Sequence, residues 1–424
     1  MKSSGVLKNI YWGWFVVAGA FVTLAVSYGA RYCFGVFVRP MFLEYQWQMS
    51  AISLGFSINI LMYALGGLVS GRLIDSMAPR WIMTIGACIT GIGFILTGFV
   101  RTPGQLYLTY GVLCGIGSAG IGIVVSGSSV GKWFVRRRGL AIGVASIGIG
   151  FGTMALTPVA GYIVKNHHWQ NGFVFLGILV LVVGVLISQI LMKRARPEEY
   201  GNTPDNDSLE ITRSGQKPAI LQASPVAVLK DYRFWILVIC FGSAIMVQTM
   251  MFVHQVGYAV NNNIDRIAAA SSLGAIGVAS IFGRFFFGWF SDRIHDPKYS
   301  ALLGYLVMAS GMVILLHTKT AGMLYAYALV FGFGYGSIAP LMPVLISDRF
   351  GRNVLGSAFG LLVFFTAGIG GSIGPVLGGV IYDTAGSYDH AWHLNIVALV
   401  CVSFLMVTLK PKRQSSVENV CGTG

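Results

Sequence analysis

Charged residues are scarce in this sequence. Asp, Glu, Lys and Arg together make up 10% of its 424 residues, whereas hydrophobic residues make up 55%. Soluble domains carry about a quarter charged residues, because a soluble surface needs them to cover an apolar core. The composition therefore excludes an ordinary soluble protein and predicts an integral membrane protein.

Cysteine is rare as well, and the 6 cysteines have no spacing typical of a metal site or a disulfide framework. The sequence has no Walker-type phosphate loop and no arrangement of a nucleophile with a base. No small-residue cleavage site follows a short apolar core, so we expect no cleaved signal peptide. We therefore predict a protein that is not an enzyme and needs no metal and no other cofactor.

The apolar residues are grouped in twelve blocks. Each block is long enough to cross a hydrocarbon layer of about 30 Å at 1.5 Å per residue. Backbone hydrogen bonds must close within such a block in lipid, so each is predicted to be a helix. The approximate spans are 12–38, 52–71, 81–100, 105–130, 139–164, 171–192, 234–259, 267–290, 300–317, 321–347, 354–382 and 391–409.

The net charge of +14 comes from Lys and Arg residues that lie mostly in one set of alternate loops. If both termini are cytoplasmic, most of these residues fall on the cytosolic side, as the positive-inside rule requires. We therefore expect a multi-pass protein of the cytoplasmic membrane with cytoplasmic N- and C-termini. Basic residues spread over membrane loops do not form the patch of a nucleic-acid-binding protein, so we expect no nucleic acid partner.

The two halves of the chain repeat each other at one constant offset. Gly71 and Asp75 recur as Gly288 and Asp292. Alternating-access carriers are built from such repeats, with the substrate bound between them near the midplane of the membrane. The repeat therefore predicts a carrier. Further pairs at this offset are Tyr110 with Tyr327, Gly115 with Gly332, Pro158 with Pro375, and Gly161 with Gly378.

We predict an all-α integral membrane fold in which twelve transmembrane helices form two pseudo-symmetric six-helix bundles. The bundles are residues 1–195 and 230–424, and the second ends in a short cytosolic tail. A polar cytosolic linker, residues 196–229, joins them. We expect the protein to be a monomer in the lipid bilayer.

Residues 71–80 read GRLIDSMAPR, and residues 288–293 read GWFSDR. Both segments resemble the loop motif of the major facilitator superfamily, although Ser76 replaces a basic residue and Ala78 a glycine. A carboxylate at a helix end that faces loop arginines can hold the cytosolic face shut and release it. The alternative is that these carboxylates only cap and solvate a turn. The candidate residues of this cytosolic gate are Asp75, Arg80, Asp292 and Arg293.

Two arginines lie within predicted spans, Arg284 in the eighth and Arg31 in the outer half of the first, whereas no carboxylate lies in the middle third of any span. A charge near the bilayer centre costs about 2.5–3.5 kcal/mol on insertion scales, so it usually faces a wet cavity or a partner. The missing counter-charge of Arg284 is most simply an anionic substrate, because a guanidinium matches a carboxylate with two parallel N–H donors. The alternative is that backbone carbonyls, or Asp265 or Asp383 at the external end, satisfy Arg284.

His254 lies in the seventh predicted span, and Tyr258 follows four residues later on the same helix face. An imidazole titrates at about pH 6.5, which makes His254 a candidate proton site. The alternative is a hydrogen bond between helices. The repeat partners of Arg284 and His254 are Gly67 and Phe37, so both positions break the internal symmetry, as expected where one small substrate binds.

Three segments resemble the monocarboxylate transporters and the related oxalate–formate antiporters. They are the first span, with WGW at 12–14, SYG at 27–29 and FGVF at 34–37, then KWFVRRRGLA at 132–141 and GRFFFGWFSDR at 283–293. The resemblance covers nearly all of both halves. In that group the arginine of the last segment binds the substrate carboxylate, and this role falls on Arg284.

The sequence departs from that group at three places. Ser280 replaces an aspartate that takes part in proton coupling in mammalian-type members, and Tyr32, beside Arg31, replaces a lysine of the first helix. Residues 358–374 lack the lysine with which oxalate carriers hold a dicarboxylate. The first two differences leave the proton mechanism open, and the third argues against a compact dicarboxylate.

The sequence thus predicts a secondary active transporter of a small organic monocarboxylate, lactate- or pyruvate-like, that works by alternating access with a proton or in exchange for a counter-anion. The alternatives are an oxalate/formate-type dicarboxylate antiporter, a drug exporter and a transporter-like receptor. A proton-driven exporter commonly needs an embedded acid, and a receptor needs an output domain that the linker is too short to hold. The predicted substrate-binding residues are Arg284, His254, Tyr32, Arg31 and Tyr258, with His254 as the candidate for proton coupling.

Overall fold

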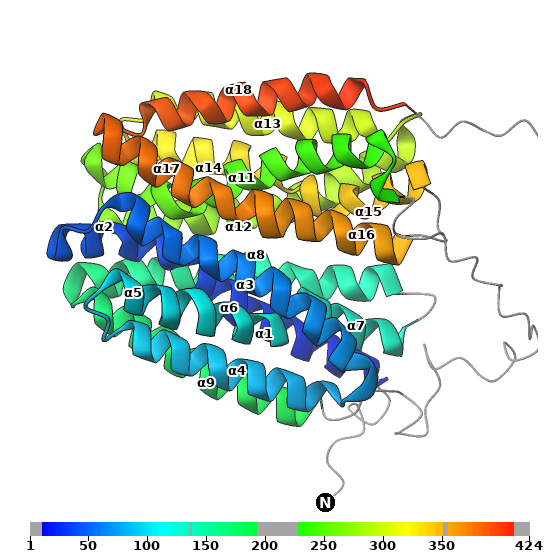
Figure 1. Cartoon of the computed structure of the whole chain (residues 1–424), viewed down its shortest axis with the longest axis horizontal. Coiled ribbons are helices and arrows are strands. Elements are labelled where there is room, and N and C mark those ends of the chain that lie inside the picture. The colour runs from blue at the N-terminus through cyan, green and yellow to red at the C-terminus, as the bar shows by residue number, and fades with distance from the viewer. Residues whose placement is uncertain (1–10, 135–137, 193–227, 351–354, 411–424) are drawn as a thin grey trace, which may run out of the picture.

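The computed structural model describes residues 11–134, 138–192, 228–350 and 355–410 (Figure 1). These residues form helices and short connections, and they include no strand. Within this part of the chain, 12 helical segments are long and apolar enough to cross a membrane. They overlap the twelve predicted spans one for one, so the all-α integral membrane fold is confirmed. The predicted linker lies outside the described residues except at 228 and 229.

Six spans make up the first half of the chain, which lies below the second half in Figure 1. The first span contains α1 (Gly13–Tyr32) and α2 (Phe34–Tyr45), and it is followed by α3 (Met49–Ser76) and α4 (Pro79–Thr97). The fourth contains α5 (Pro103–Leu106), the π-helix η2 (Tyr107–Cys114), α6 (Gly115–Gly120) and α7 (Ile123–Trp133). The last two are α8 (Arg138–Asn166) and α9 (Trp169–Leu191).

The second half has the same order of spans. It begins with α11 (Tyr232–Asn261), α12 (Arg266–Arg293) and α13 (Lys298–Leu316). The next span contains α14 (Ala321–Tyr335) and α15 (Ile338–Phe350), and the one after it contains α16 (Leu355–Val363), the π-helix η7 (Phe364–Gly370) and α17 (Gly371–Ala385). The last is α18 (Asp389–Val407).

Large apolar side chains lie exposed on the outer helices. Leu186 and Ile190 of α9 are 53% and 59% exposed, and Phe404 of α18 is 71% exposed. A soluble monomer rarely exposes such continuous apolar surface, whereas lipid tails are a suitable neighbour for it. The protein is therefore a multi-pass membrane protein.

We call the end of the bundle at which α1 begins and α18 ends the terminal end, and the opposite end the far end. In Figure 1, α2 and α5 mark the far end on the left, and α7 and α16 mark the terminal end on the right. The two halves pack against each other along α8 and α12 and along α3 and α17. Glycine makes this packing close: a Cβ on Gly150 or on Gly277 would lie within 2.8 Å of the other residue's carbonyl oxygen. Small residues of this kind let membrane helices approach backbone to backbone.

At the far end an ion pair joins the halves. Lys165, near the end of α8, places its Nζ 2.7 Å from Oδ1 of Asp265, and Asp265 caps α12 by accepting from the backbone N–H of Ile267 and Ala268. The hydrogen bond from Lys165 holds the pKa of Asp265 below its ordinary value of 3.8. The far end of the molecule is thus closed by contacts between the two halves.

Candidate functional site

Arg284 lies on α12 where the helix packs backbone to backbone against the break between α14 and α15. A Cβ on Gly336, in that break, would lie 2.6 Å from the carbonyl oxygen of Ser280 and 2.7 Å from the backbone nitrogen of Arg284. Gly283 similarly leaves no room for a side chain beside the carbonyl of Phe333. The backbone that carries Arg284 is therefore held in place, and the side chain leaves α12 toward the other half.

The guanidinium of Arg284 is only partly satisfied. One terminal nitrogen donates to the carbonyl oxygen of Ser146 on α8, at 3.1 Å, which links the two halves. Its Nε is buried and has no hydrogen-bond partner, and no carboxylate of the described residues pairs with it. Of the alternatives raised by the sequence, a backbone carbonyl does take one donor, whereas Asp265 and Asp383 bond elsewhere. The remaining donors are available to an anion.

Tyr32, at the end of α1, follows Arg31 in the chain and lies near Arg284. Its ring stacks on that of Phe252 of α11, with the centroids 4.3 Å apart. Its hydroxyl lies near the positive charges of Arg31 and Arg284 and near the hydroxyl of Tyr335, the last residue of α14. Tyr32 and Arg284, predicted from distant segments, are thus brought together.

Arg31 is almost fully buried in the first half, with 5% of its surface exposed. Its guanidinium lies over the ring of Tyr63 at 4.3 Å from the centroid, and a terminal nitrogen reaches the carbonyl oxygen of Asn59 only at 3.5 Å. Its Nε has no partner. Hydrogen bonds of this length are weak, so the buried cation is held chiefly by the aromatic face of Tyr63.

We call Arg31, Tyr32, Phe252 and Arg284 the central cluster. The tyrosines around it were not predicted from the sequence. Tyr28 shares a 2.7 Å hydroxyl–hydroxyl hydrogen bond with Tyr63, and its ring lies 5.7 Å from that of Tyr32. Because Tyr28 and Tyr32 are four residues apart on one helix, this spacing was a signal that the sequence did contain.

His254 lies in a separate place, fully buried on α11. Its Nε2 is 2.8 Å from the carbonyl oxygen of Pro375 and 3.3 Å from Oγ of Ser53, and its Nδ1 is 3.1 Å from the hydroxyl of Tyr388. A carbonyl only accepts, so Nε2 carries the proton and Tyr388 donates to Nδ1. Ser53 belongs to α3, so this imidazole joins both halves. Among the described residues, no hydrogen bond connects it to the central cluster.

Tyr258 turns away from the space between the halves. Its hydroxyl donates to the carbonyl oxygen of Leu315 at 3.3 Å, at the end of α13, and its ring meets that of Trp392 edge-on at 5.5 Å. The structure therefore places Tyr258 within the second half, and its ring approaches Tyr388, the partner of His254, at 6.5 Å.

The predicted gate residues lie at the terminal end. The side chain of Asp75 is outside the described residues. Arg80 lies over the ring of Trp81 at 5.0 Å and Arg293 over that of Trp289 at 4.8 Å, and Asp292 is exposed. In the described part of the chain, none of these side chains forms an ion pair between the halves, so the latch stays a prediction for a state that is closed at this end.

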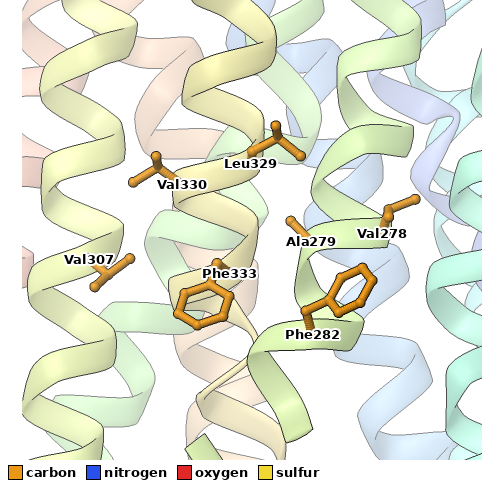
Figure 2. Close-up of a pocket in the computed structure, with 7 residues that line it drawn as sticks. All are labelled: Val278, Ala279, Phe282, Val307, Leu329, Val330 and Phe333. Carbon is orange, nitrogen blue, oxygen red and sulfur yellow. The ribbon is translucent and has the colours of Figure 1, made fainter. Parts of the chain in front are cut away.

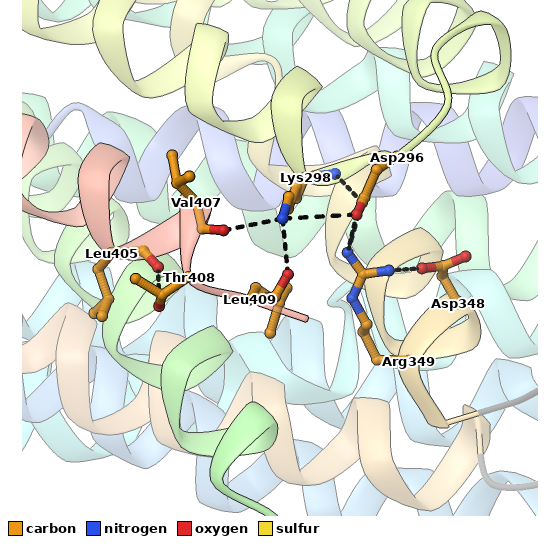
Figure 3. A network of polar contacts seen from close by, with 8 residues as sticks. All are labelled: Asp296, Lys298, Asp348, Arg349, Leu405, Val407, Thr408 and Leu409. Carbon is orange, nitrogen blue, oxygen red and sulfur yellow. Dashed lines mark hydrogen bonds and ion pairs between the residues drawn. The ribbon is translucent and has the colours of Figure 1, made fainter. Parts of the chain in front are cut away.

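A charged network that the sequence analysis missed lies beside these residues (Figure 3). Arg349 of α15 is buried and places one terminal nitrogen 2.5 and 2.7 Å from the two carboxylate oxygens of Asp296, while the other bonds to Asp348. Lys298 donates to the carbonyl oxygens of Val407 and Leu409, each at 2.9 Å, at the end of α18. The network ties three elements of the second half together.

The sequence profile of the Major Facilitator Superfamily matches residues 20–375. The chain belongs to the Major Facilitator Superfamily. Members of this superfamily are transporters, so the protein is not an enzyme.

Several curated relatives align with nearly the whole chain. Monocarboxylate transporter 12-B of Danio rerio is 27% identical, over 96% of this chain and 89% of its own length. Monocarboxylate transporter 12 of Mus musculus is 29% identical, over 93% and 85%. Monocarboxylate transporter 2 of Homo sapiens is 26% identical, over 90% and 82%.

Solved superfamily structures share the fold. A bacterial homologue of the human lysosomal transporter Spinster, in an inward-facing and unoccupied conformation, superimposes with a TM-score of 0.71 at 15% identity and covers 96% of each chain. The nucleoside transporter NupG gives a TM-score of 0.71 at 13% identity and covers 94% of this chain and 99% of its own. At these identities the likeness shows the fold alone.

An apolar groove lies on the surface of the second half (Figure 2). It has a volume of about 390 Å³ and is open at the surface. It contains no charged side chain and no member of the central cluster, so it is not the site at which an anion would bind. Its lining residues are Val278, Ala279, Phe282, Val307, Leu329, Val330 and Phe333.

Proposed function

We propose that this protein is a secondary transporter that carries a small organic monocarboxylate, lactate- or pyruvate-like, across the cytoplasmic membrane by alternating access. The observation that carries the proposal is Arg284: a guanidinium between the halves whose Nε is buried without a partner and which no described carboxylate neutralises. An embedded charge of this kind usually marks a substrate path. The names of the relatives at 26% to 29% identity support the same substrate class.

The central cluster has the chemistry that such a substrate needs. The free donors of Arg284 match a carboxylate, and the hydroxyls of Tyr32 and Tyr335 can bond a keto or hydroxyl oxygen next to it. The aromatic walls supplied by Tyr32 and Phe252 suit a short apolar tail. His254 and Tyr258 lie on α11 together with Phe252, and they contribute to this site by fixing the position of that helix.

For transport direction we propose that the terminal end is cytosolic, as the positive-inside rule requires. The far end is then external and is the closed one. Substrate in this state would reach Arg284 from the cytosol, and rocking of the halves would open the far end instead.

For the coupling partner we propose a proton or a counter-anion, with His254 as the candidate proton site. Nε2 of His254 already donates to the carbonyl oxygen of Pro375, so a second proton on the imidazole must bind to Nδ1. A second proton on Nδ1 requires the Tyr388 hydroxyl to become the acceptor. Since Ser53 of the other half also contacts this imidazole, the change of charge would act on the contact between the halves.

A dicarboxylate antiporter of oxalate–formate type is the second candidate, and one observation favours it. Arg31 is a second buried guanidinium without a carboxylate partner among the described residues, and its charge acts on Tyr32 together with that of Arg284. Two cations near one tyrosine could hold two carboxylates.

The test of the proposed function is uptake of labelled lactate and pyruvate by liposomes that contain the purified protein. We expect saturable uptake into a closed volume, with competition by other short monocarboxylates. Binding without accumulation would indicate a receptor instead, and uptake of amphipathic cations with no effect of organic acids would indicate a drug exporter.

A further inference from the structure

The α3 helix begins at the far end without a cap of its own. The residue before it, Gln48, is extended and its side chain makes no capping hydrogen bond. The cap comes from the other half of the molecule. Asp383, near the end of α17, accepts from the backbone N–H of Met49 with one carboxylate oxygen and from that of Ser50 with the other, each at 2.8 Å.

The two helices are close enough for this only because of glycine. A Cβ on Gly379, one turn before Asp383, would lie 2.6 Å from Cα of Ser50. Along the same face of α3, Ser53 bonds to His254, and Ile60 would meet a Cβ on Gly371 at 3.4 Å. The start of α3 therefore lies directly on the second half.

The internal repeat gives a matched comparison. At the offset that relates the halves, Gln48 corresponds to Asp265, and Asp383 corresponds to Asn166. In the second half, Asp265 caps α12 from its own chain segment, and the contact that the opposite half makes with Asp265 is the exposed Lys165. The first half lacks that cap and receives it across the interface. One of the two equivalent contacts is thus an exposed ion pair, and the other supplies a helix with its missing cap.

We propose that Asp383 is a positioning residue for transport, the latch that holds the far end closed. The first backbone N–H groups of a helix have no partner within the helix. When the far end is closed, Asp383 satisfies two of them and places a negative charge at the helix start, where it is favourable. Opening the far end separates α3 from α17 and leaves these groups uncapped, so the bond stabilises the closed state only. This proposal rests on the alternating access of the proposed function.

A cysteine in place of Ser57 can report the opening of the far end. Ser57 lies between Ser53 and Ile60 on the same face of α3, it is 4% exposed, and its hydroxyl has no hydrogen-bond partner to lose. In a background without native cysteines, Ser57→Cys is expected to react with a membrane-impermeant thiol reagent only when the far end opens. The reagent is applied in turn to each side of the membrane.

Asp383→Ala is expected to raise the rate of labelling from the far side about fivefold, the factor that corresponds to a typical helix cap. Lys165→Gln, the matched control at the equivalent contact, is expected to leave the rate within about twofold, since exposed ion pairs contribute little. Asp383 is exposed, so Asp383→Ala leaves no cavity in the core. An unchanged rate in Asp383→Ala, or an equal rise in Lys165→Gln, would overturn the proposal.

Gln48→Asp separates the latch from a general loss of stability. It gives α3 a cap from its own segment, so opening no longer leaves the helix start uncapped. We expect faster labelling from the far side together with unchanged or higher thermal stability, whereas a purely structural role of Asp383 predicts no change in labelling. Because labelling needs no substrate, a failed latch and a failed monocarboxylate assignment are seen in separate assays.

Discussion

The ring of Tyr32 stacks on the ring of Phe252 at an interplanar angle of 17°, and the two residues belong to opposite halves of the molecule. The contact lies beside Arg284, whose charge acts on the Tyr32 hydroxyl. Tyr32 therefore has two separable properties, a ring that stacks across the interface between the halves and a hydroxyl that lies near the charges of Arg31 and Arg284.

Tyr32→Phe keeps the stack and removes the hydroxyl. If the hydroxyl bonds the substrate, KM for uptake should rise about fivefold, as expected for one lost hydrogen bond, with little change in the maximal rate. Uptake kinetics in liposomes measure this. Phe252→Leu is the complementary variant, which removes the stack but not the hydroxyl, and it should alter the maximal rate instead. Unchanged kinetics in Tyr32→Phe would remove Tyr32 from the binding site.

Arg284→Lys should reduce kcat/KM for uptake about 10- to 100-fold, because the charge remains but the two parallel donors are lost. Arg284→Gln should reduce it at least as much. Neither variant should impair folding, since no described carboxylate depends on this guanidinium. Elution as a single species and an unchanged melting temperature are the controls. Near-normal uptake by both variants would rule out the anion site.

Whether the site accepts a monocarboxylate or a dicarboxylate depends on Arg31. Monocarboxylates should compete for uptake of labelled lactate, whereas oxalate should compete poorly, because the buried guanidinium of Arg31 lies over the ring of Tyr63 and bonds within the first half. Competition by both anions is measured in the wild type and in Arg31→Gln. Strong inhibition by oxalate that disappears in Arg31→Gln would show that both arginines form the site and would favour the dicarboxylate antiporter.

The spans and the repeat could be predicted because membrane crossing imposes a length and a composition on each helix. The importance of Arg284 could be predicted too, since an embedded charge is costly wherever it lies. The pairs Tyr32 with Phe252 and Asp383 with Met49 could not, because each joins opposite halves in one conformation. A sequence contains both partners but not the state that brings them together.

The charged residues of the terminal end show a second limit. The loop motif predicted Asp292 as a gate residue, and this side chain is exposed. Asp296, four residues later, pairs with Arg349. The direction in which the chain turns after α12 ends at Arg293 decides which carboxylate faces inward. That direction depends on packing against α15 and α18, which the local sequence does not reveal.

Arg349→Met should destabilise the protein by about 3 kcal/mol, because it leaves the buried carboxylate of Asp296 without its main partner. The double variant Asp296→Leu with Arg349→Met should recover most of this loss, since replacing both members of a buried pair is often neutral. Thermal unfolding in detergent measures both. Arg293→Gln, at an exposed arginine nearby, is the control and should leave the melting temperature unchanged. A double variant no more stable than Arg349→Met would contradict this account of the network.

The remaining prediction concerns the coupling ion, for which His254 is the candidate. A proton on Nδ1 would place a positive charge in a fully buried site, next to the contact with Ser53 of the other half. Burial disfavours that charge, so protonation should accompany a rearrangement in which Tyr388 turns its hydroxyl and the far end loosens. Protonation of His254 and the movement of the halves are then coupled. The same movement also displaces the substrate bound at Arg284.

His254→Gln should then keep the exchange of substrate for substrate, which needs no net proton movement, and lose accumulation driven by an inward pH gradient. Both modes are measured in liposomes at two pH values. Tyr388→Phe is the matched variant: it retains the imidazole but removes the partner of Nδ1, so it should keep accumulation and change its dependence on pH. If His254 serves only as a hydrogen bond between helices, both variants lower the melting temperature and leave coupling intact. If His254→Gln still accumulates substrate with the wild-type dependence on pH, the imidazole serves only for packing at the far end, and the proton takes another path.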